Sequence, residues 1–139
     1  MIVYPNAKIN IGLNIIRKKD DGYHELSSIF YPVLAVYDVL EILPSDKFSL
    51  SISGIEIPGK GNICEKAWRL LHADFGIADV KIHLHKKIPV GAGLGGGSAD
   101  ASFTLKVLNE LFELHLSNAQ LEKYALILGA DCPFFIDNT

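Results

Sequence analysis

A glycine-rich run that opens into a helical pattern constrains this chain more than any other feature. The segment Gly91-Ala92-Gly93-Leu94-Gly95-Gly96-Gly97 places five glycines in seven positions, and Ser98 follows directly. Glycine adopts positive φ readily and lets the backbone approach a ligand closely. A helix that begins after such a run offers unpaired N–H groups and the positive end of its dipole to an anion. The run therefore indicates a phosphate-binding loop, and a nucleotide is the first ligand to consider.

Two better-known phosphate-binding loops do not fit this run. A P-loop requires a lysine before the hydroxyl residue, whereas Gly97 leads directly to Ser98. The run also matches G-x-G-x-x-G, but a dinucleotide fold needs an acid at the end of a strand about 20 residues later. The acids found there, Glu110 and Glu113, lie in a helical pattern. A plain flexible loop remains the alternative from the run alone.

Length and composition fit one soluble domain. The chain has 139 residues, 49% apolar and 21% charged, which suits a single core. No apolar run approaches the ~18 residues that cross a bilayer, and the N-terminus shows no secretory signal, so we expect a cytoplasmic protein without a membrane partner. Two cysteines, Cys64 and Cys132, are too few for a disulfide framework or a four-ligand zinc site. The net charge of −3 argues against a nucleic-acid partner.

The N-terminal segment 7–16 alternates polar and apolar residues with period two, which predicts a strand. We expect Ile9 and Ile11 on the face toward the core, with Lys8 and Asn10 on the other face. Residues two apart on one strand face are about 7 Å apart, close enough to address one ligand. A solvated strand face is the alternative.

Further extended patterns cover 23–33, after a turn at 20–22, and 38–43, 48–52 and 80–84. At the last of these, His83 and His85 alternate with apolar residues. A metal site is one interpretation, but a solvent-facing strand explains the alternation, and we assign no metal there.

Three helices are predicted. The first begins near Asn62, which can cap it, and ends at Gly76. The second follows the glycine run, where apolar residues recur every three to four positions. Ser117 opens the third with capping-box spacing, and Gly129 ends it. A short apolar strand is expected at 134–136.

Asp131 is placed between the helix end at Gly129 and Pro133. Taken singly, a turn aspartate is usually structural, and Lys8 and the glycine run each have a structural explanation as well. Together they supply the parts of a phosphoryl-transfer site, namely a cradle for phosphate, a cation for developing charge and a base for a hydroxyl.

The segments that contain these residues also carry a family resemblance. Four segments, in order and spacing, resemble the motifs of the branch of the GHMP kinase superfamily that phosphorylates 4-diphosphocytidyl-2-C-methyl-D-erythritol with ATP. They are Pro5-Asn6-Ala7-Lys8-Ile9-Asn10, Asp21-Gly22-Tyr23-His24-Glu25-Leu26, Gly93-Leu94-Gly95-Gly96-Gly97-Ser98 and Gly129-Ala130-Asp131-Cys132-Pro133-Phe134-Phe135. The glycine run alone indicates only the superfamily.

The resemblance implies phosphorylation of the 2-hydroxyl of that substrate, a step of the non-mevalonate route to isoprenoid precursors. On this interpretation Asp131 is the catalytic base and Lys8 its partner. Asn10 lies near the erythritol portion, and Tyr23 with His24 holds the cytosine ring. From chemistry alone, an aromatic ring and an imidazole could stack on and hydrogen-bond any base.

The resemblance also implies an ATP site, with Mg²⁺ accompanying the nucleotide. Ser98 is the plausible Mg²⁺ ligand, directly or through water. Two residues depart from the family's common pattern, Ala99 for serine and Cys132 for valine. The residues expected around ATP are Pro89, Gly91, Gly93, Leu94, Gly95, Gly96, Gly97 and Ser98, with Asn62 and Lys86 near adenine.

The implied fold is α+β, an α/β sandwich of the ribosomal protein S5 domain 2-like type, with helices on one side of a mixed sheet. Members of the family carry a second domain of comparable size after the segment that ends here. We therefore expect 1–139 to be the N-terminal, ATP-binding and catalytic domain, with the C-terminal GHMP domain absent. The apolar face left exposed favours self-association.

Three alternatives remain open. Another GHMP kinase, acting on mevalonate, homoserine or a sugar, would share the glycine run but would not need the segment Asp21–His24. A nucleotide-binding domain without turnover would bind ATP without transferring phosphate. A nucleic-acid module of the same fold is disfavoured by the acidic balance.

Overall fold

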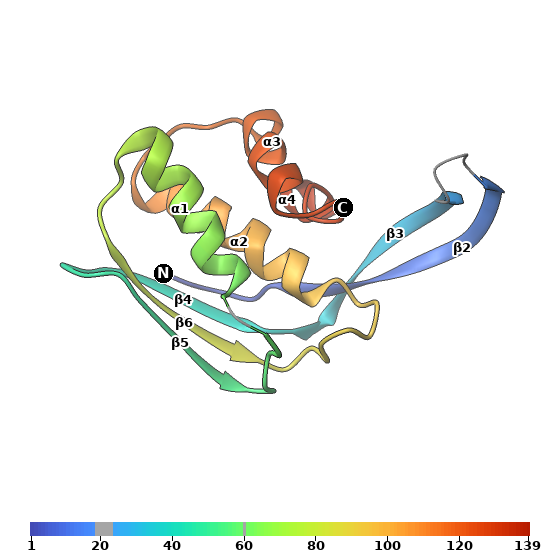
Figure 1. Ribbon diagram of the computed structural model, residues 1–139, viewed down its shortest axis with the longest axis horizontal. Helices are drawn as coiled ribbons and strands as arrows, with labels where there is room; N and C mark the ends of the chain where they lie inside the picture. The colour runs from blue at the N-terminus through green and yellow to red at the C-terminus, as the bar shows by residue number, and fades with distance from the viewer. Residues whose placement is uncertain (19–23, 60) are drawn as a thin grey trace.

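The computed structural model describes residues 1–18, 24–59 and 61–139. Within these ranges, four strands form a sheet in the order β1-β4-β6-β5. Two helices, α1 and α2, lie side by side over one face of that sheet (Figure 1). The strands of the sheet are β1 (Ile2–Val3), β4 (Val39–Pro44), β5 (Ser49–Gly54) and β6 (Val80–Lys86).

The sheet is mixed, as the resemblance implied. β5 runs parallel to β6, while β1 and β6 run antiparallel to β4. The strands predicted at 38–43, 48–52 and 80–84 are confirmed, because apolar residues alternate toward the helices along β4 and β6. Fully buried side chains of this central layer include Leu40, Ile42, Ile82 and Leu84.

A second, two-stranded sheet is formed by β2 (Asn6–Lys18) and β3 (His24–Tyr37). The two strands pair antiparallel, with Ile9 opposite Tyr31 and Ile11 opposite Ile29. Their far ends project beyond the helices (Figure 1). The predicted strand in 7–16 and the hairpin are confirmed, whereas the turn expected at 20–22 lies outside the described residues.

The expected orientation of β2 is wrong. Lys8 is only 3% exposed, whereas Ile9 is 41% and Ile11 is 47% exposed. The Lys8 N–H donates to the Leu94 carbonyl at 2.8 Å, so this face of the strand lies against the glycine-rich loop. Alternation in the sequence identifies two faces of a strand but does not say which face the rest of the chain covers.

The predicted helix ends are confirmed. Asn62 caps α1 (Ile63–Phe75) by accepting from the Cys64 N–H at 2.8 Å, and Gly76 ends it at φ 62°. Ser117 and Gln120 form both halves of a capping box on α3 (Asn118–Leu128). The helix after the glycine run is α2 (Gly96–Leu111). None of the described helices combines the length and apolar character needed to cross a membrane.

The strand expected at 134–136 is wrong, because these residues begin α4 (Phe134–Asp137). Pro133 has helical φ and ψ of −55° and −35°, and the Phe135 and Ile136 N–H groups donate to the carbonyls of Cys132 and Pro133, three residues earlier. Three consecutive apolar residues show no period that separates strand from helix. The short helix buries Phe135 and Ile136 against the rest of the fold.

Candidate active site

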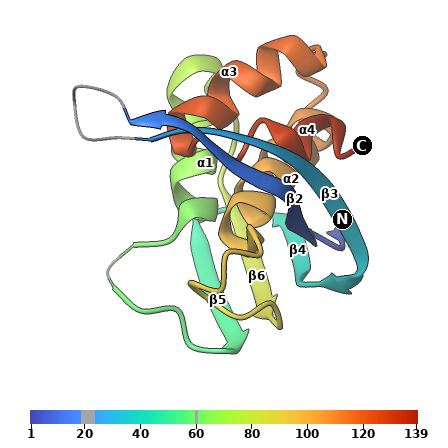
Figure 2. The same ribbon diagram turned by 90° about the vertical axis from the view of Figure 1, so that its right-hand side faces the viewer.

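The glycine-rich loop joins the end of β6 to the start of α2 (Figure 2). Gly91, Gly93 and Gly95 have φ of 75°, 75° and 70°, a region that side chains disfavour. Gly95 is the N-cap of α2, and the Ala99 N–H makes the first helical bond, to the Gly95 carbonyl at 2.9 Å. The N–H groups of residues 96–98 therefore precede the helical ladder, as an anion site requires.

The loop borders a cavity of about 410 Å³. A Cβ added at Gly91, Gly93 or Gly97 would meet no atom within 4 Å, so these positions face open space that a phosphate chain could fill. The residues present thus fit a nucleotide. All those expected around ATP line this cavity, namely Pro89, Gly91, Gly93, Leu94, Gly95, Gly96, Gly97, Ser98, Asn62 and Lys86. Their contact with ATP stays a prediction.

Lys8, Asn10 and Asp131 come together beside the loop. The Lys8 ammonium donates to Asn10 Oδ1 at 2.6 Å and lies 3.4 Å from Asp131 Oδ2. It also lies 4.3 Å from the centroid of the Phe30 ring. Lys8 is buried, while the Asp131 side chain is 41% exposed. An accessible carboxylate is thus held by an ammonium that the fold fixes in place.

Gly95 connects this group to the phosphate cradle. A Cβ at Gly95 would lie 2.9 Å from both Lys8 Cγ and Phe135 Cζ. The loop can therefore pack this closely on the Lys8 stem only without a side chain at that position. The cation and the start of α2 are consequently fixed relative to each other, which the sequence spacing alone did not reveal.

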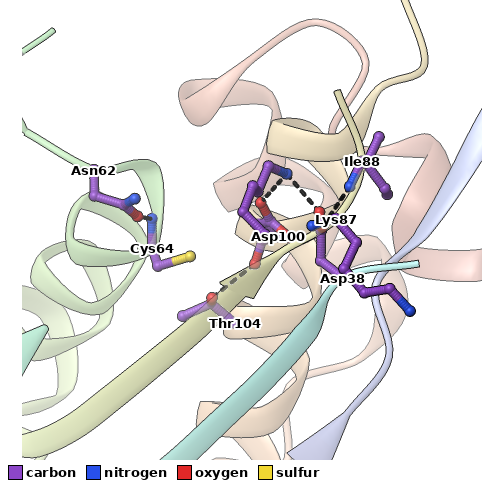
Figure 3. Close-up of polar contacts among 8 residues, drawn as sticks. Asp38, Asn62, Cys64, Lys87, Ile88, Asp100 and Thr104 are labelled. Atoms are coloured by element: carbon purple, nitrogen blue, oxygen red, sulfur yellow. Dashed lines mark hydrogen bonds and ion pairs between the residues drawn. The ribbon is translucent and has the colours of Figure 1, made fainter. Parts of the chain in front are cut away.

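Two further acids near the cavity, Asp38 and Asp100, were missed from the sequence, and they lie close together in Figure 3. Both bind Lys86. The Lys86 ammonium donates to Asp38 Oδ2 at 2.5 Å and to Asp100 Oδ2 at 2.7 Å. The side chains of Asp38, Lys86 and Asp100 are 0%, 3% and 1% exposed. One signal was available, because Asp100 precedes the buried residues Thr104 and Leu108 at helical spacing.

The charged groups in this cluster affect the pKa values of Asp100 and Lys86. Burial raises the pKa of Asp100 to about 7, although the Lys86 ammonium acts in the opposite direction. Burial by itself would lower the pKa of Lys86, but Asp100 and Asp38 outweigh it and raise that pKa. Within the described residues, Asp100 Oδ1 is buried with no hydrogen-bond partner. Asp100 is also one of the residues that line the cavity.

The remaining predicted residues are placed in part. Asn10 is exposed beside Lys8. Tyr23 and the side chain of His24, the first residue of β3, lie outside what the structure describes. Ser98 is half-buried in the first turn of α2, at the cavity wall. No group of three or more His, Cys, Asp or Glu side chains among the described residues is arranged to hold a metal ion.

Comparison with known proteins agrees with this geometry. Residues 62–138 match the family described as GHMP kinases N terminal domain. A 4-diphosphocytidyl-2-C-methyl-D-erythritol kinase from Bacteroides fragilis is 56% identical over 99% of the chain, which covers 52% of that protein. One from Cytophaga hutchinsonii is 50% identical over 100% of the chain, which again covers 52% of it.

A solved structure leads to the same family. The crystal structure of a 4-(cytidine 5'-diphospho)-2C-methyl-D-erythritol kinase superposes with a TM-score of 0.84 at 37% identity, covering 99% of this chain and 49% of that one. The chain thus spans about half the length of the curated relatives it matches. With the family match, the glycine-rich loop and the mixed sheet under its helices, the chain belongs to the GHMP kinase family, as an N-terminal domain.

Proposed function

We propose that the protein carrying this chain transfers the γ-phosphoryl group of ATP to the 2-hydroxyl of 4-diphosphocytidyl-2-C-methyl-D-erythritol, in non-mevalonate isoprenoid precursor biosynthesis. GHMP kinases use ATP, and the two kinases compared above carry this substrate in their names. The observation that carries the proposal is the Lys8–Asp131 pair, 3.4 Å apart and packed against the glycine-rich loop. This is the arrangement that phosphoryl transfer to an alcohol needs.

Asp131 is the base in this proposal. Its exposed carboxylate takes the proton of the substrate hydroxyl while the hydroxyl oxygen forms its bond to phosphorus and the bond to ADP breaks. Lys8 orients that carboxylate through the 3.4 Å contact, and its charge faces the negative charge that builds up during transfer. Asn10 fixes the ammonium from the other side at 2.6 Å.

The loop and the start of α2 bind the phosphates. The backbone N–H groups of Gly96, Gly97 and Ser98 are aligned at a helix N-terminus, where an anion is stabilised. Mg²⁺, when bound, neutralises phosphate charge, and the Ser98 hydroxyl is the residue we assign to it, directly or through water. Asn62 and Lys86, which both line the cavity, are the residues we assign to the adenine end.

Tyr23 and His24 hold the cytosine ring, and Asn10 lies near the erythritol portion. This assignment is supported by the match of the segment 21–26 to the family motif. Residues 1–139 act as the N-terminal domain of a two-domain kinase in this proposal. The hairpin face formed by Ile9, Ile11, Ile29 and Tyr31 is exposed and apolar, which favours self-association of the 139-residue chain.

Calorimetric titration of the 139-residue chain with ATP, and then with the cytidyl substrate, tests the proposal. We expect both to bind at separate sites. Binding of ATP without the cytidyl substrate would favour another GHMP kinase or a nucleotide-binding domain without turnover. For turnover, the chain is joined to the C-terminal half of the Bacteroides fragilis relative, and we call this protein the chimaera.

A further inference from the structure

The two ends of the glycine-rich loop are joined below it by one buried ion cluster. Lys86 is the last residue of β6, and Asp100 is the fifth residue of α2. The loop occupies the positions between them. The Lys86 ammonium donates to Asp100 Oδ2 at 2.7 Å, so this contact ties the strand before the loop to the helix after it.

Asp38 secures the entrance of the loop. It lies between β3 and β4, fully buried, and its Oδ2 accepts from the Lys86 ammonium. Its Oδ1 accepts from the Lys87 and Ile88 N–H groups at 2.5 and 2.8 Å (Figure 3). One carboxylate thus holds three donors where the chain leaves the sheet, and bonds to an ionised acceptor are among the stronger ones.

The cluster lies directly beneath the first residue of α2. A Cβ at Gly96 would lie 2.9 Å from the Lys86 Nζ and 2.8 Å from Ile88 Cγ2. The position of the helix N-terminus therefore depends on where the ammonium is held. Asp38 also contacts the chain just before β2, the strand that carries Lys8, because its N–H donates to the Pro5 carbonyl at 2.9 Å.

From these contacts we propose that Asp38, Lys86 and Asp100 are positioning residues, which hold the entrance and exit of the glycine-rich loop so that the α2 N–H groups address the nucleotide phosphates. The proposal rests on the proposed use of this loop for ATP. In this proposal the Lys86 ammonium binds two carboxylates of the protein, whereas the resemblance placed Lys86 beside adenine. Ordering the loop in advance lowers the cost of binding.

Substitution of Asp38 can distinguish a positioning role of the cluster from direct contact with the nucleotide. It does not line the cavity, while Lys86 and Asp100 do. Asp38→Asn keeps the size of the side chain and removes its charge. If Lys86 bound the nucleotide phosphates directly, Asp38→Asn would remove a carboxylate that competes for its ammonium, so the affinity for ATP would stay the same or rise. If the cluster positions the loop, the loss of one carboxylate weakens ATP binding from outside the cavity.

Two measurements on the 139-residue chain test the proposal, with Leu71→Ala as the control for lost stability. Leu71 is fully buried in α1 and does not line the cavity, and a large-to-small change there destabilises the core. We expect Asp38→Asn to raise the Kd for ATP at least about tenfold at a temperature well below its Tm. Leu71→Ala is expected to change that Kd less than about twofold, despite an equal or larger fall in Tm.

Amide hydrogen exchange without nucleotide gives the second readout. We expect Asp38→Asn to speed exchange of the Ala99 amide, at the far end of the loop, as well as of the Lys87 and Ile88 amides. Unchanged exchange at Ala99, or an unchanged Kd for ATP, would overturn the proposal. If the wild-type chain failed to bind ATP, the proposed function would fail instead, whereas exchange would still decide whether the cluster orders the loop. Should Asp38→Asn not fold, Asp38→Glu keeps the charge but displaces it and is expected to give the same two effects.

Discussion

The Lys8 ammonium lies 3.4 Å from Asp131 Oδ2, although the two residues come from opposite ends of the chain. The contact forms because β2 binds the glycine-rich loop through its backbone, with the Lys8 N–H 2.8 Å from the Leu94 carbonyl. Asp131 reaches the same place through the turn between α3 and α4. The cation, the carboxylate and the phosphate cradle are therefore built from three separate segments that pack on one another.

Asp131→Asn tests the role of this carboxylate in the chimaera. An amide keeps the shape of the side chain but cannot take the hydroxyl proton. We expect kcat to fall at least ~10²-fold, because a general base acts on the transition state. The Kd for ATP is expected to stay nearly unchanged in calorimetry. Turnover retained within a few-fold would make Asp131 structural.

The charge of Lys8 is tested by comparing Lys8→Met with Lys8→Ala. Methionine fills much of the space of the buried stem beside Gly95, whereas alanine leaves a gap there. We expect both variants to lower kcat in the chimaera, and Lys8→Ala to lower Tm further. If Lys8→Met turned over as fast as wild type, Lys8 would have no electrostatic role.

Gly95→Ala and Gly97→Ala form a matched pair in the loop. At Gly95 a Cβ meets two side chains at 2.9 Å and φ is positive, while at Gly97 nothing lies within 4 Å. We expect Gly95→Ala to lower the free energy of unfolding by at least about 1–2 kcal/mol, the cost of a left-handed backbone alone. Thermal or urea denaturation measures this. Equal stability of the two variants would contradict the packing of the loop on Lys8.

His24→Ala tests the assignment of the cytosine site in the chimaera. We expect the KM for the cytidyl substrate to rise and the KM for ATP to stay the same, since the segment 21–26 is assigned to the cytosine ring and the glycine-rich loop to ATP. Steady-state kinetics with each substrate varied in turn separates the two. A raised KM for ATP would place the segment 21–26 in the other pocket.

Burial of the two cysteines predicts slow reaction with iodoacetamide. Burial raises the pKa of Cys64 to about 12, and it also raises the pKa of Cys132. Since the thiolate is the reactive form, both should be alkylated far more slowly at pH 8 in the native chain than in denaturant. Mass spectrometry of the labelled chain measures this. Rapid labelling of native Cys64 would contradict its burial in the first turn of α1.

Local signals predicted much of the fold. Asn62 and Gly76 bound α1 because capping depends on a few neighbouring residues. The glycine run predicted both a loop and the start of a helix. The predicted orientation of β2 was wrong because burial of Lys8 depends on the glycine-rich loop, which is distant in sequence. The strand expected at 134–136 failed because so short a run carries no period.

The sequence predicted the residues proposed for chemistry and phosphate binding, but it did not predict the residue that supports the loop. Lys8, Asp131 and the loop were found because their residue types match a known chemistry. Asp38 was missed, since a single acid beside a strand resembles a surface residue until Lys86, Lys87 and Ile88 are seen around it. Its role depends on a contact across 48 positions of sequence, which no local pattern carries.

The most direct measurement is phosphoryl transfer itself, followed by ³¹P NMR in the chimaera supplied with ATP, Mg²⁺ and 4-diphosphocytidyl-2-C-methyl-D-erythritol. We expect a new phosphate monoester on this substrate, formed only with ATP, and lost with Asp131→Asn. Mevalonate and homoserine, offered in its place, should yield no product. A chimaera that folds and binds ATP yet leaves the cytidyl substrate unphosphorylated would contradict the proposed function.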